Sequence, residues 1–184
     1  MQFEHTAIPA VTIVTPKKHS DARGSFSEVY KQSEWRGAGL DCVFVQDNHS
    51  YSAPAGTLRG LHFQIDPAGQ DKLIRVTRGR ILDVVVDLRR SSPTFGKHIA
   101  VELSAANWRQ LFVPIGFAHG FVTLESDTEV LYKVTSLYSP AHDRGLAWDD
   151  PDLGIDWNIP AGGPLLSERD KHWPRLRDLK DAFA

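Results

Sequence analysis

The chain consists largely of short segments with β-strand composition, and this pattern limits the possible fold more than any other feature. The segments are rich in Val, Ile, Phe and Tyr, and they are separated by Gly, Pro, Ser or Asn. Many short strands at such spacing predict an all-β sandwich, barrel or jelly roll. The predicted strands are Ser25–Lys31, Cys42–Gln46, Leu58–Gln64, Leu73–Thr77, Arg80–Leu88, His98–Leu103, Gln110–Val113, Gly120–Leu124 and Glu129–Thr135.

Helical signals are brief and predict only short helices. They cover Ser33–Arg36, Ser104–Trp108 and the last dozen residues of a tail that begins at about residue 168. In the tail, Leu176, Leu179 and Phe183 recur at helical spacing, so one face of it is expected to pack against the rest of the chain. A length of 184 residues suits a single domain over residues 1–184 with a sizeable core.

Charge and composition argue against several classes of partner. The 21 basic and 23 acidic residues are mixed along the chain, with a net charge of −2, so no basic tract indicates nucleic acid. The longest apolar stretches have the length of strands, and no membrane span is predicted. Cys42 is the only cysteine, which precludes an intrachain disulfide and fits a reducing cytoplasm. The first residues lack the basic and apolar regions of a secretory signal.

Residues 56–79 have the spacing of a metal site without its ligands. Gly56 is followed after five residues by His62, Gln64 stands two positions further on, and Lys72 precedes Gly79 by six intervening residues. This spacing resembles the first motif of the cupin family, which has His at the position of Gln64 and Glu at the position of Lys72. A second segment, Pro114–His119, resembles the second cupin motif. Because an ammonium group repels a divalent cation, the pattern predicts a cupin-type pocket with no metal.

Asp83 lies in the most apolar of the predicted strands. Leu82, Val84, Val86 and Leu88 share one side of that strand, and Ile81, Asp83, Val85 and Asp87 share the other. Both sides are largely apolar, so the strand is expected to be covered on both faces and Asp83 to need a buried partner. A structural pairing, in which Asp83 caps a turn or binds an Arg, is the simplest expectation for a single buried carboxylate.

Several polar residues together suit proton transfer at a carbon beside a ketone, although each alone has an ordinary structural explanation. A histidine can remove the proton, and a carboxylate behind the imidazole fixes its tautomer. Lys72 can stabilise the enolate oxygen, and a tyrosine hydroxyl can return a proton from the opposite face. Two proton-transfer groups on opposite faces of one carbon give inversion. This chemistry needs no redox cofactor, and the sequence has no Gly-rich dinucleotide motif.

Arginines next to glycines offer a handle for an anionic substrate. Arg23 precedes Gly24 and Arg59 precedes Gly60, and a guanidinium group suits phosphate oxygens. A surface ion pair is the commoner role of an Arg. Strict alternation would place Arg59 on the strand face opposite His62, and a bulge at Gly60 would bring both to one side.

Longer motifs resemble one known family, that of the dTDP-4-dehydrorhamnose 3,5-epimerases, from about residue 5 to residue 175. This resemblance implies an epimerase that acts on C3 and C5 of a dTDP-4-keto-6-deoxyhexose. The motifs that carry the resemblance are Asp21–Gly24, Phe44–Ser50, Leu58–Gln64, Ser91–Lys97, Pro114–Phe121, Glu129–Lys133 and Leu166–Asp170.

The resemblance implies a cupin-type jelly roll that works as a homodimer, without metal or cofactor, on a dTDP-sugar. It implies His62 as proton acceptor, Asp170 as its orienting carboxylate, Tyr132 as proton donor and Lys72 at the enolate. His119 with Asp83 would line the sugar site, Arg59 would hold the diphosphate, and Tyr138 would stack on thymine. The other implied substrate contacts are Gln46, Asp47, Asn48, Asp143, Arg169 and, from the partner subunit, Arg23 and Glu28.

Two positions depart from the family pattern, and three other functions remain open. The family commonly has Glu at Asp143 and Lys at Arg169; both substitutions keep the charge but change the reach or the geometry. One alternative is an epimerase of C3 alone or C5 alone, or a keto-isomerase, which would share the same His and Tyr chemistry. The others are a metal-dependent cupin such as a dioxygenase, against which Gln64 and Lys72 argue, and a non-catalytic sugar-nucleotide binding module.

Overall fold

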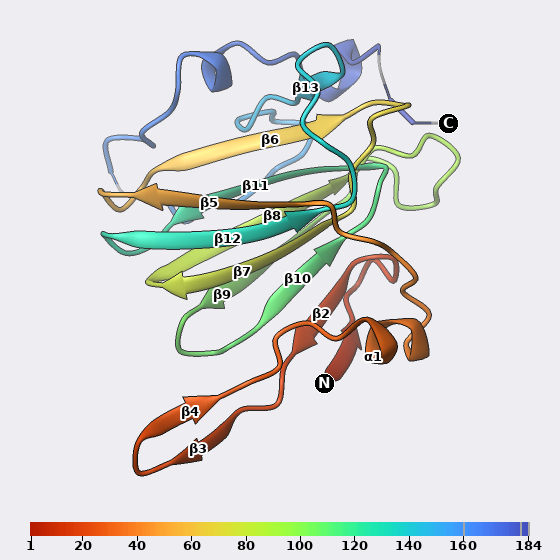
Figure 1. Ribbon diagram of the computed structural model, residues 1–184. Helices are drawn as coiled ribbons and strands as arrows, with labels where there is room; N and C mark the ends of the chain where they lie inside the picture. The colour runs from red at the N-terminus through yellow and green to blue at the C-terminus, as the bar shows by residue number, and fades with distance from the viewer. Residues whose placement is uncertain (160, 181, 184) are drawn as a thin grey trace.

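Two antiparallel sheets stack as a sandwich in the computed structural model, which describes residues 1–159, 161–180 and 182–183 (Figure 1). The prediction of an all-β fold is therefore confirmed. The larger sheet has the order β1 (Gln2–His5), β2 (Thr12–Thr15), β10 (Gln110–Val113), β7 (Lys72–Arg78), β12 (Thr128–Val134), β5 (Gln46–Ser52). The smaller has the order β13 (Asp143–Gly145), β6 (Leu58–Gln64), β11 (Phe117–Thr123), β8 (Arg80–Asp87), β9 (His98–Ser104).

The strand β8 is buried on both faces, as its sequence predicts. Ile81 and Val85 belong to the core between the two sheets, together with Ile74 of the larger sheet. Val84 and Val86 point the other way, into a second core that the C-terminal part of the chain covers. Because side chains alternate along a strand, one apolar strand serves both layers.

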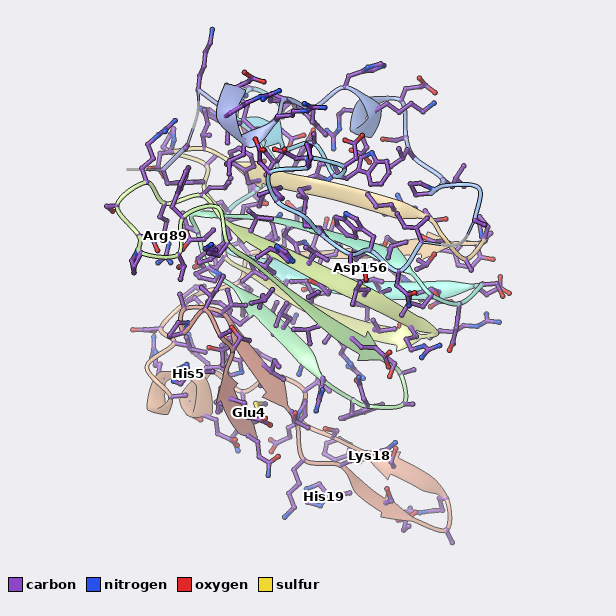
Figure 2. The ribbon with its side chains drawn as sticks, turned by 180° about the vertical axis from the view of Figure 1, so that it is seen from behind. Glu4, His5, Lys18, His19, Arg89 and Asp156 are labelled. Carbon is purple, nitrogen blue, oxygen red and sulfur yellow. The ribbon has the colours of Figure 1, made fainter. Side chains whose placement is uncertain are left out.

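A hairpin and a short helix follow the first two strands. The helix α1 (Gln32–Gly37) packs the fully buried Trp35 edge-on against Phe112 of β10, on the outer face of the larger sheet. The hairpin of β3 (His19–Asp21) and β4 (Gly24–Phe26) extends away from the sandwich (Figure 1), and Lys18 and His19 mark it in the reverse view (Figure 2). The Phe26 side chain on it is 70% exposed, which is unusual for an aromatic group.

Several predicted elements need correction. The strand predicted at Cys42–Gln46 instead begins at Gln46 and runs to Ser52, and the one predicted over Ser25–Lys31 is the short β4. The segment Ser104–Trp108 is a turn rather than a helix, because the Asn107 side chain accepts hydrogen bonds from the Ser104 and Arg109 amides. Four short strands are not among the predicted ones: β1, β2, β3 and β13.

The C-terminal tail packs as predicted but is not a helix over its last dozen residues. It contains the single-turn 3-10 helices η1 (Arg169–Lys171) and η2 (Leu176–Asp178). Leu176, Leu179 and Phe183 lie against the second core, so their apolar spacing reflects docking rather than helical structure. Residues 181 and 184 of the predicted helix lie outside the described part of the chain. Among the residues that the structure describes, no helix is long and apolar enough to cross a membrane.

Candidate active site

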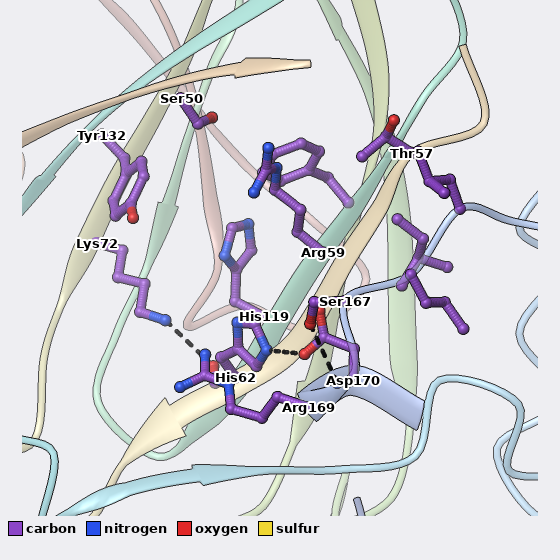
Figure 3. Close-up of a pocket in the computed structure, with 14 residues that line it drawn as sticks. Ser50, Thr57, Arg59, His62, Lys72, His119, Tyr132, Ser167, Arg169 and Asp170 are labelled. Atoms are coloured by element: carbon purple, nitrogen blue, oxygen red, sulfur yellow. Dashed lines mark hydrogen bonds and ion pairs between the residues drawn. The ribbon is translucent and has the colours of Figure 1, made fainter. Parts of the chain in front are cut away.

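A cavity of about 720 Å³ opens between the two sheets (Figure 3). The larger sheet contributes one wall, the smaller sheet contributes the opposite wall, and the segment around η1 closes one side. Its polar lining consists of Ser50, Lys72 and Tyr132 from the larger sheet, Thr57, Arg59, His62 and His119 from the smaller sheet and the turn before it, and Ser167, Arg169 and Asp170 from the C-terminal segment.

His62 forms a dyad with Asp170, which lies more than a hundred residues away in sequence. The Asp170 carboxylate is only 3% exposed, and its Oδ1 is 2.5 Å from His62 Nε2 and 3.2 Å from the indole Nε1 of Trp173. Burial raises the pKa of Asp170, but its hydrogen bonds to His62, Ser167 and Trp173 outweigh this and hold the pKa below its usual value. With a proton on Nε2 for Asp170, the imidazole has an unshared electron pair on Nδ1.

A bulge at Gly60 brings Arg59 and His62 to the same cavity, as the sequence predicts. His62 pairs with His119, whereas Arg59 pairs with Phe121, so three steps along β6 match two along β11. Gly60 has a φ of +136°, and a Cβ there would stand 2.5 Å from the Gly120 Cα. No other residue fits this position without a shift of the backbone. Arg59 donates to the Ser52 hydroxyl and to the Tyr51 carbonyl.

His119 and Asp83 form a second imidazole–carboxylate pair, deeper in the sandwich. Both Asp83 oxygens lie within reach of His119 Nε2, at 2.9 and 3.0 Å, and the Asp83 side chain is fully buried. Burial raises the pKa of Asp83, against the opposing effects of His119 and Lys72. The partner of Asp83 is therefore a histidine of the cavity, not the turn or the Arg expected for a single buried carboxylate.

Lys72 stands where a metal-binding cupin places its acidic ligand. Its ammonium group is buried in the cavity wall and donates to the His62 carbonyl at 3.1 Å. Burial lowers the pKa of Lys72 to about 8, although Asp143 and Asp83 both favour its charged form. The described residues contain no group of three or more His, Cys, Asp or Glu side chains placed to hold one metal ion.

Tyr132 faces the histidines from the opposite sheet (Figure 3). It lies on β12, with Ile74 of β7 and Asn48 of β5 as its neighbours in register. Its side chain is half-buried, and burial raises the pKa of the phenol. At neutral pH the hydroxyl therefore carries its proton, which it can donate.

A connected set of side chains lies at the Gln64 end of β6, where Asp143 of β13 is paired with Gln64. Arg169 forms an ion pair with Asp143, whose Oδ2 also accepts from the Tyr138 hydroxyl at 3.2 Å. Gln46 accepts from the Tyr138 amide and donates to Asn48. Asp47 points away from this set, because it alternates with Gln46 and Asn48 along β5, and it pairs with Lys133.

Eight predicted substrate contacts are not among the residues that line the cavity: Gln46, Asp47, Asn48, Asp83, Tyr138, Asp143, Arg23 and Glu28. Arg23 lies on the projecting hairpin and pairs with Asp21, and Glu28 follows the hairpin and faces Lys31 at 3.6 Å. Both side chains are exposed. Sequence analysis expects them to act in the partner subunit, and their position on this chain leaves that prediction open.

Seven residues that line the cavity are not singled out by the sequence: Ser50, Thr57, Leu58, Phe121, Leu165, Leu166 and Ser167. Phe121 is two positions from His119 on the same strand, so strand alternation alone could have found it. Ser50 follows from the same rule once β5 is known to extend to Ser52. Ser167 accepts from the Asp170 amide through its hydroxyl, a local contact that the sequence does not single out.

Comparison with known proteins agrees with this geometry. The sequence model of the dTDP-4-dehydrorhamnose 3,5-epimerase family matches residues 5–178. The dTDP-4-dehydrorhamnose 3,5-epimerase of Sinorhizobium fredii is 50% identical over 183 residues, which cover 100% of this chain and 93% of that protein. The chain is thus related to curated epimerases over its whole length.

Solved structures of epimerases share the fold. The Bacillus anthracis dTDP-4-dehydrorhamnose 3,5-epimerase, with TDP and pyrophosphate bound, has a TM-score of 0.91 at 47% identity and covers 95% of this chain and 98% of its own. The Legionella pneumophila dTDP-6-deoxy-D-glucose-3,5-epimerase, in complex with dTDP-4-keto-L-rhamnose, has a TM-score of 0.93 at 38% identity, with 97% and 94% covered. A Streptomyces bikiniensis 3′-monoepimerase in complex with dTDP-quinovose has a TM-score of 0.87 at 36% identity, with 94% and 87% covered.

Fold and cavity together define the class of the protein: a cupin-type jelly-roll isomerase, with acid–base side chains on two facing sheets. Within that class, the chain belongs to the dTDP-4-dehydrorhamnose 3,5-epimerase family.

Proposed function

We propose that the protein inverts C3 and C5 of dTDP-4-dehydro-6-deoxy-D-glucose and so forms dTDP-4-dehydro-L-rhamnose, a step of dTDP-L-rhamnose biosynthesis. The observation that carries this proposal is the placement of His62 and Tyr132 on opposite walls of one cavity. A sugar ring between them presents one face to a base and the other to an acid. Both sheets and the C-terminal segment build this single site, which supports the prediction of one domain over residues 1–184.

The first step breaks a C–H bond beside the C4 ketone. Nδ1 of His62 takes the proton, and the electron pair moves to the ketone oxygen to form an enolate. Asp170 stabilises the resulting imidazolium through Nε2, at 2.5 Å, as the carboxylate of a catalytic triad does. The protonated Lys72 stabilises the enolate oxygen, a role worth roughly a hundredfold or more in rate for one well-placed donor.

The second step returns a proton from the opposite face. The Tyr132 hydroxyl gives its proton to the carbon, the enolate becomes a ketone again, and the configuration is inverted. Solvent then restores the tyrosine proton and accepts the histidine proton. His119, held by Asp83, lines the sugar end of the cavity as a hydrogen-bonding group.

The nucleotide end is proposed to hold the thymidine diphosphate. Arg59 and Arg169 have guanidinium groups for the diphosphate, and the exposed ring of Tyr138 offers a face for thymine. Gln46 and Asn48, with Asp143, complete this end. Asp47, which was predicted as a contact, is proposed to act only through its backbone, because its side chain points away.

A homodimer would complete the site with Arg23 and Glu28 of a second copy. The projecting hairpin with its exposed Phe26 supports this arrangement, as does β5, which is the last strand of the larger sheet and has no further partner within the described chain. In such a dimer, the hairpin of one copy would reach the nucleotide end of the other. The proposed setting is the cytoplasm, where the sugar nucleotide would be made.

A second candidate is an epimerase of C3 alone. The likeness to the 3′-monoepimerase favours it, because that protein has the same fold at 36% identity. Both activities use the same base and acid, and they differ in how many carbons exchange their hydrogen.

Incubation with dTDP-4-dehydro-6-deoxy-D-glucose in heavy water separates these functions. Deuterium at both C3 and C5, read by NMR or mass spectrometry, is the expected result. Label at one carbon would instead support a mono-epimerase, and no label would reject the epimerase proposal for this substrate. His62→Ala should abolish exchange, whereas Tyr132→Phe should keep some exchange but little inversion. Normal exchange in His62→Ala would show that the base is assigned wrongly.

A further inference from the structure

The loop that presents Tyr138 has little apolar packing to hold it in place. It lies between β12 and β13 and has no regular secondary structure over residues 136–139. The side chains of Leu137 and Tyr138 are 66% and 53% exposed, so neither anchors the loop by burial. A loop of this kind is normally mobile unless polar contacts fix its backbone.

Glutamine side chains make a polar contact to each of the four residues of this loop. Gln70 Nε2 donates to the Ser136 carbonyl at 2.7 Å, and Gln64 Nε2 donates to the Leu137 carbonyl at 3.2 Å. Gln64 Oε1 accepts from the Ser139 amide at 2.7 Å. The remaining contact is that of Gln46 with the Tyr138 amide. We call this set of three side chains the glutamine cradle.

Gln64 is the centre of the cradle, because both N–H groups and the oxygen of its amide form hydrogen bonds. It is 4% exposed, and its second N–H donates to the Ala68 carbonyl at 2.7 Å, which ties the loop after β6 to the loop after β12. Two carbonyls face the NH₂ group and one N–H faces the oxygen, so a flipped amide would lose all three contacts.

We propose that Gln64 and Gln70 are positioning residues for nucleotide binding, because they hold the loop 136–139 so that the Tyr138 ring meets the base. This rests on the proposed function, in which a nucleoside diphosphate occupies that end of the cavity. The two glutamines touch the loop backbone and not the ligand. They lower the cost of binding because the loop is ordered before the base arrives.

The residue type at position 64 fits this role better than the histidine of a metal-binding cupin. A neutral imidazole has one donor and one acceptor, whereas the primary amide has two donors and an acceptor in one plane. Only the amide can join two carbonyls and one N–H. Gln64, which stands where a metal-binding cupin has a histidine ligand, thus fixes the loop 136–139 through hydrogen bonds.

The test compares dTDP with inorganic pyrophosphate as ligands of the intact protein. Gln64→Met keeps the size of the side chain and removes its hydrogen bonds; Gln70→Met removes the single bond to Ser136. Calorimetry should give a dissociation constant for dTDP that rises about tenfold in Gln64→Met and about threefold in Gln70→Met, as expected for the loss of several and of one hydrogen bond. The pyrophosphate constant should stay unchanged, because no base is bound.

A mutant cycle with Tyr138→Ala tests whether the glutamine acts through the tyrosine. Tyr138→Ala alone should weaken dTDP binding by about tenfold or more, the usual range for loss of base stacking. Adding Gln64→Met should then cause little further loss, since the loop no longer presents a ring. Full additivity of the two effects would overturn the proposal, as would equal loss of dTDP and pyrophosphate affinity.

Asn107→Leu is the matched control. This amide also makes three contacts to backbone groups, with Ser104 and Glu102 at the end of β9 and with Arg109 after the turn between β9 and β10. It should lower the melting temperature without changing the dTDP constant; a change like that of Gln64→Met would mean that general loosening explains both. If the wild-type protein bound no dTDP at all, the proposed function would fail instead, which separates the two outcomes.

Discussion

The two ends of the cavity differ in how much of them one chain supplies. At the reacting end, two sheets and the tail bring together His62, Asp170, Lys72 and Tyr132, and His62 contacts both Asp170 and Lys72 within this chain. At the nucleotide end, the predicted contacts Arg23 and Glu28 lie on the projecting hairpin and just after it, and Tyr138 is largely exposed.

The difference has a physical cause. Groups that transfer protons must be held to within a fraction of an ångström, and β-strands and buried ion pairs provide such rigidity. A nucleotide tail offers charge and a flat ring, which looser contacts from loops and from a second copy can hold. We expect substitutions at the reacting end to act on kcat, and substitutions at the nucleotide end to act on KM.

After the loss of the base in His62→Ala, the largest effect is expected at Lys72. Replacing it with Met should lower kcat by about a hundredfold to a thousandfold, as for loss of one donor to a developing oxyanion, with a small change in KM. A loss confined to KM would contradict the comparison, because Lys72 would then belong to the binding end. Normal circular dichroism of the variant would establish that the fold is intact.

The pH dependence sharpens the same assignment. Burial lowers the pKa of Lys72 from 10.5 to about 8, so the charged form is lost as pH rises through about 8, and kcat/KM should fall there. Between these two values, the unfolded chain binds more protons at this lysine than the folded chain does, so Lys72 makes stability rise with pH. Falling activity with rising stability would exclude unfolding as the cause. In Lys72→Met, the residual kcat/KM should not show this decrease as the pH rises.

At the nucleotide end, Arg23→Ala should raise KM by about tenfold or more, the usual result of removing a charged hydrogen-bond donor, with kcat largely kept. A mixed dimer of Arg23→Ala and His62→Ala chains tests where Arg23 acts. If it acts in the partner's cavity, one of the two sites in the mixed dimer has both His62 and Arg23, and its KM returns to the wild-type value. If Arg23 served its own chain, neither site would contain both groups, and the mixed dimer would stay impaired.

The reacting end was predictable from sequence because its strands also build the core. The bounds of β6 and β10 agree with the prediction to the residue, since their apolar side chains face the two cores. Likewise, a glycine within a predicted strand indicates a bulge, and the bulge at Gly60 brings Arg59 and His62 to the same cavity.

The nucleotide end was less predictable because its residues carry little apolar pattern. The strand β5 reads Gln-Asp-Asn-His-Ser-Tyr-Ser; Gln46 and Ser50 on its inner side serve the binding end and the cavity rather than a core. At the turn Ser104–Trp108 and in the tail, the sequence predicts a helix that the structure does not have. Residues that make local polar contacts in the turn, and apolar residues that dock against the core in the tail, have the spacing of a helix. Strand prediction thus fails first where side chains bind a ligand instead of packing.

The smallest effects are expected at Asp143 and Arg169, where this chain departs from the family's Glu and Lys. The two side chains form an ion pair, and Asp143 also accepts from the Tyr138 hydroxyl, so they belong to one network. The shorter Asp143 is matched by the longer Arg169, so changing one of them alone disturbs their ion pair. Asp143→Glu or Arg169→Lys alone should therefore raise KM about threefold, whereas the double variant should return close to wild type. Steady-state kinetics of the four proteins measures the coupling. Additive losses would mean that the two residues contact the substrate independently, and a drop in kcat would place them at the reacting end.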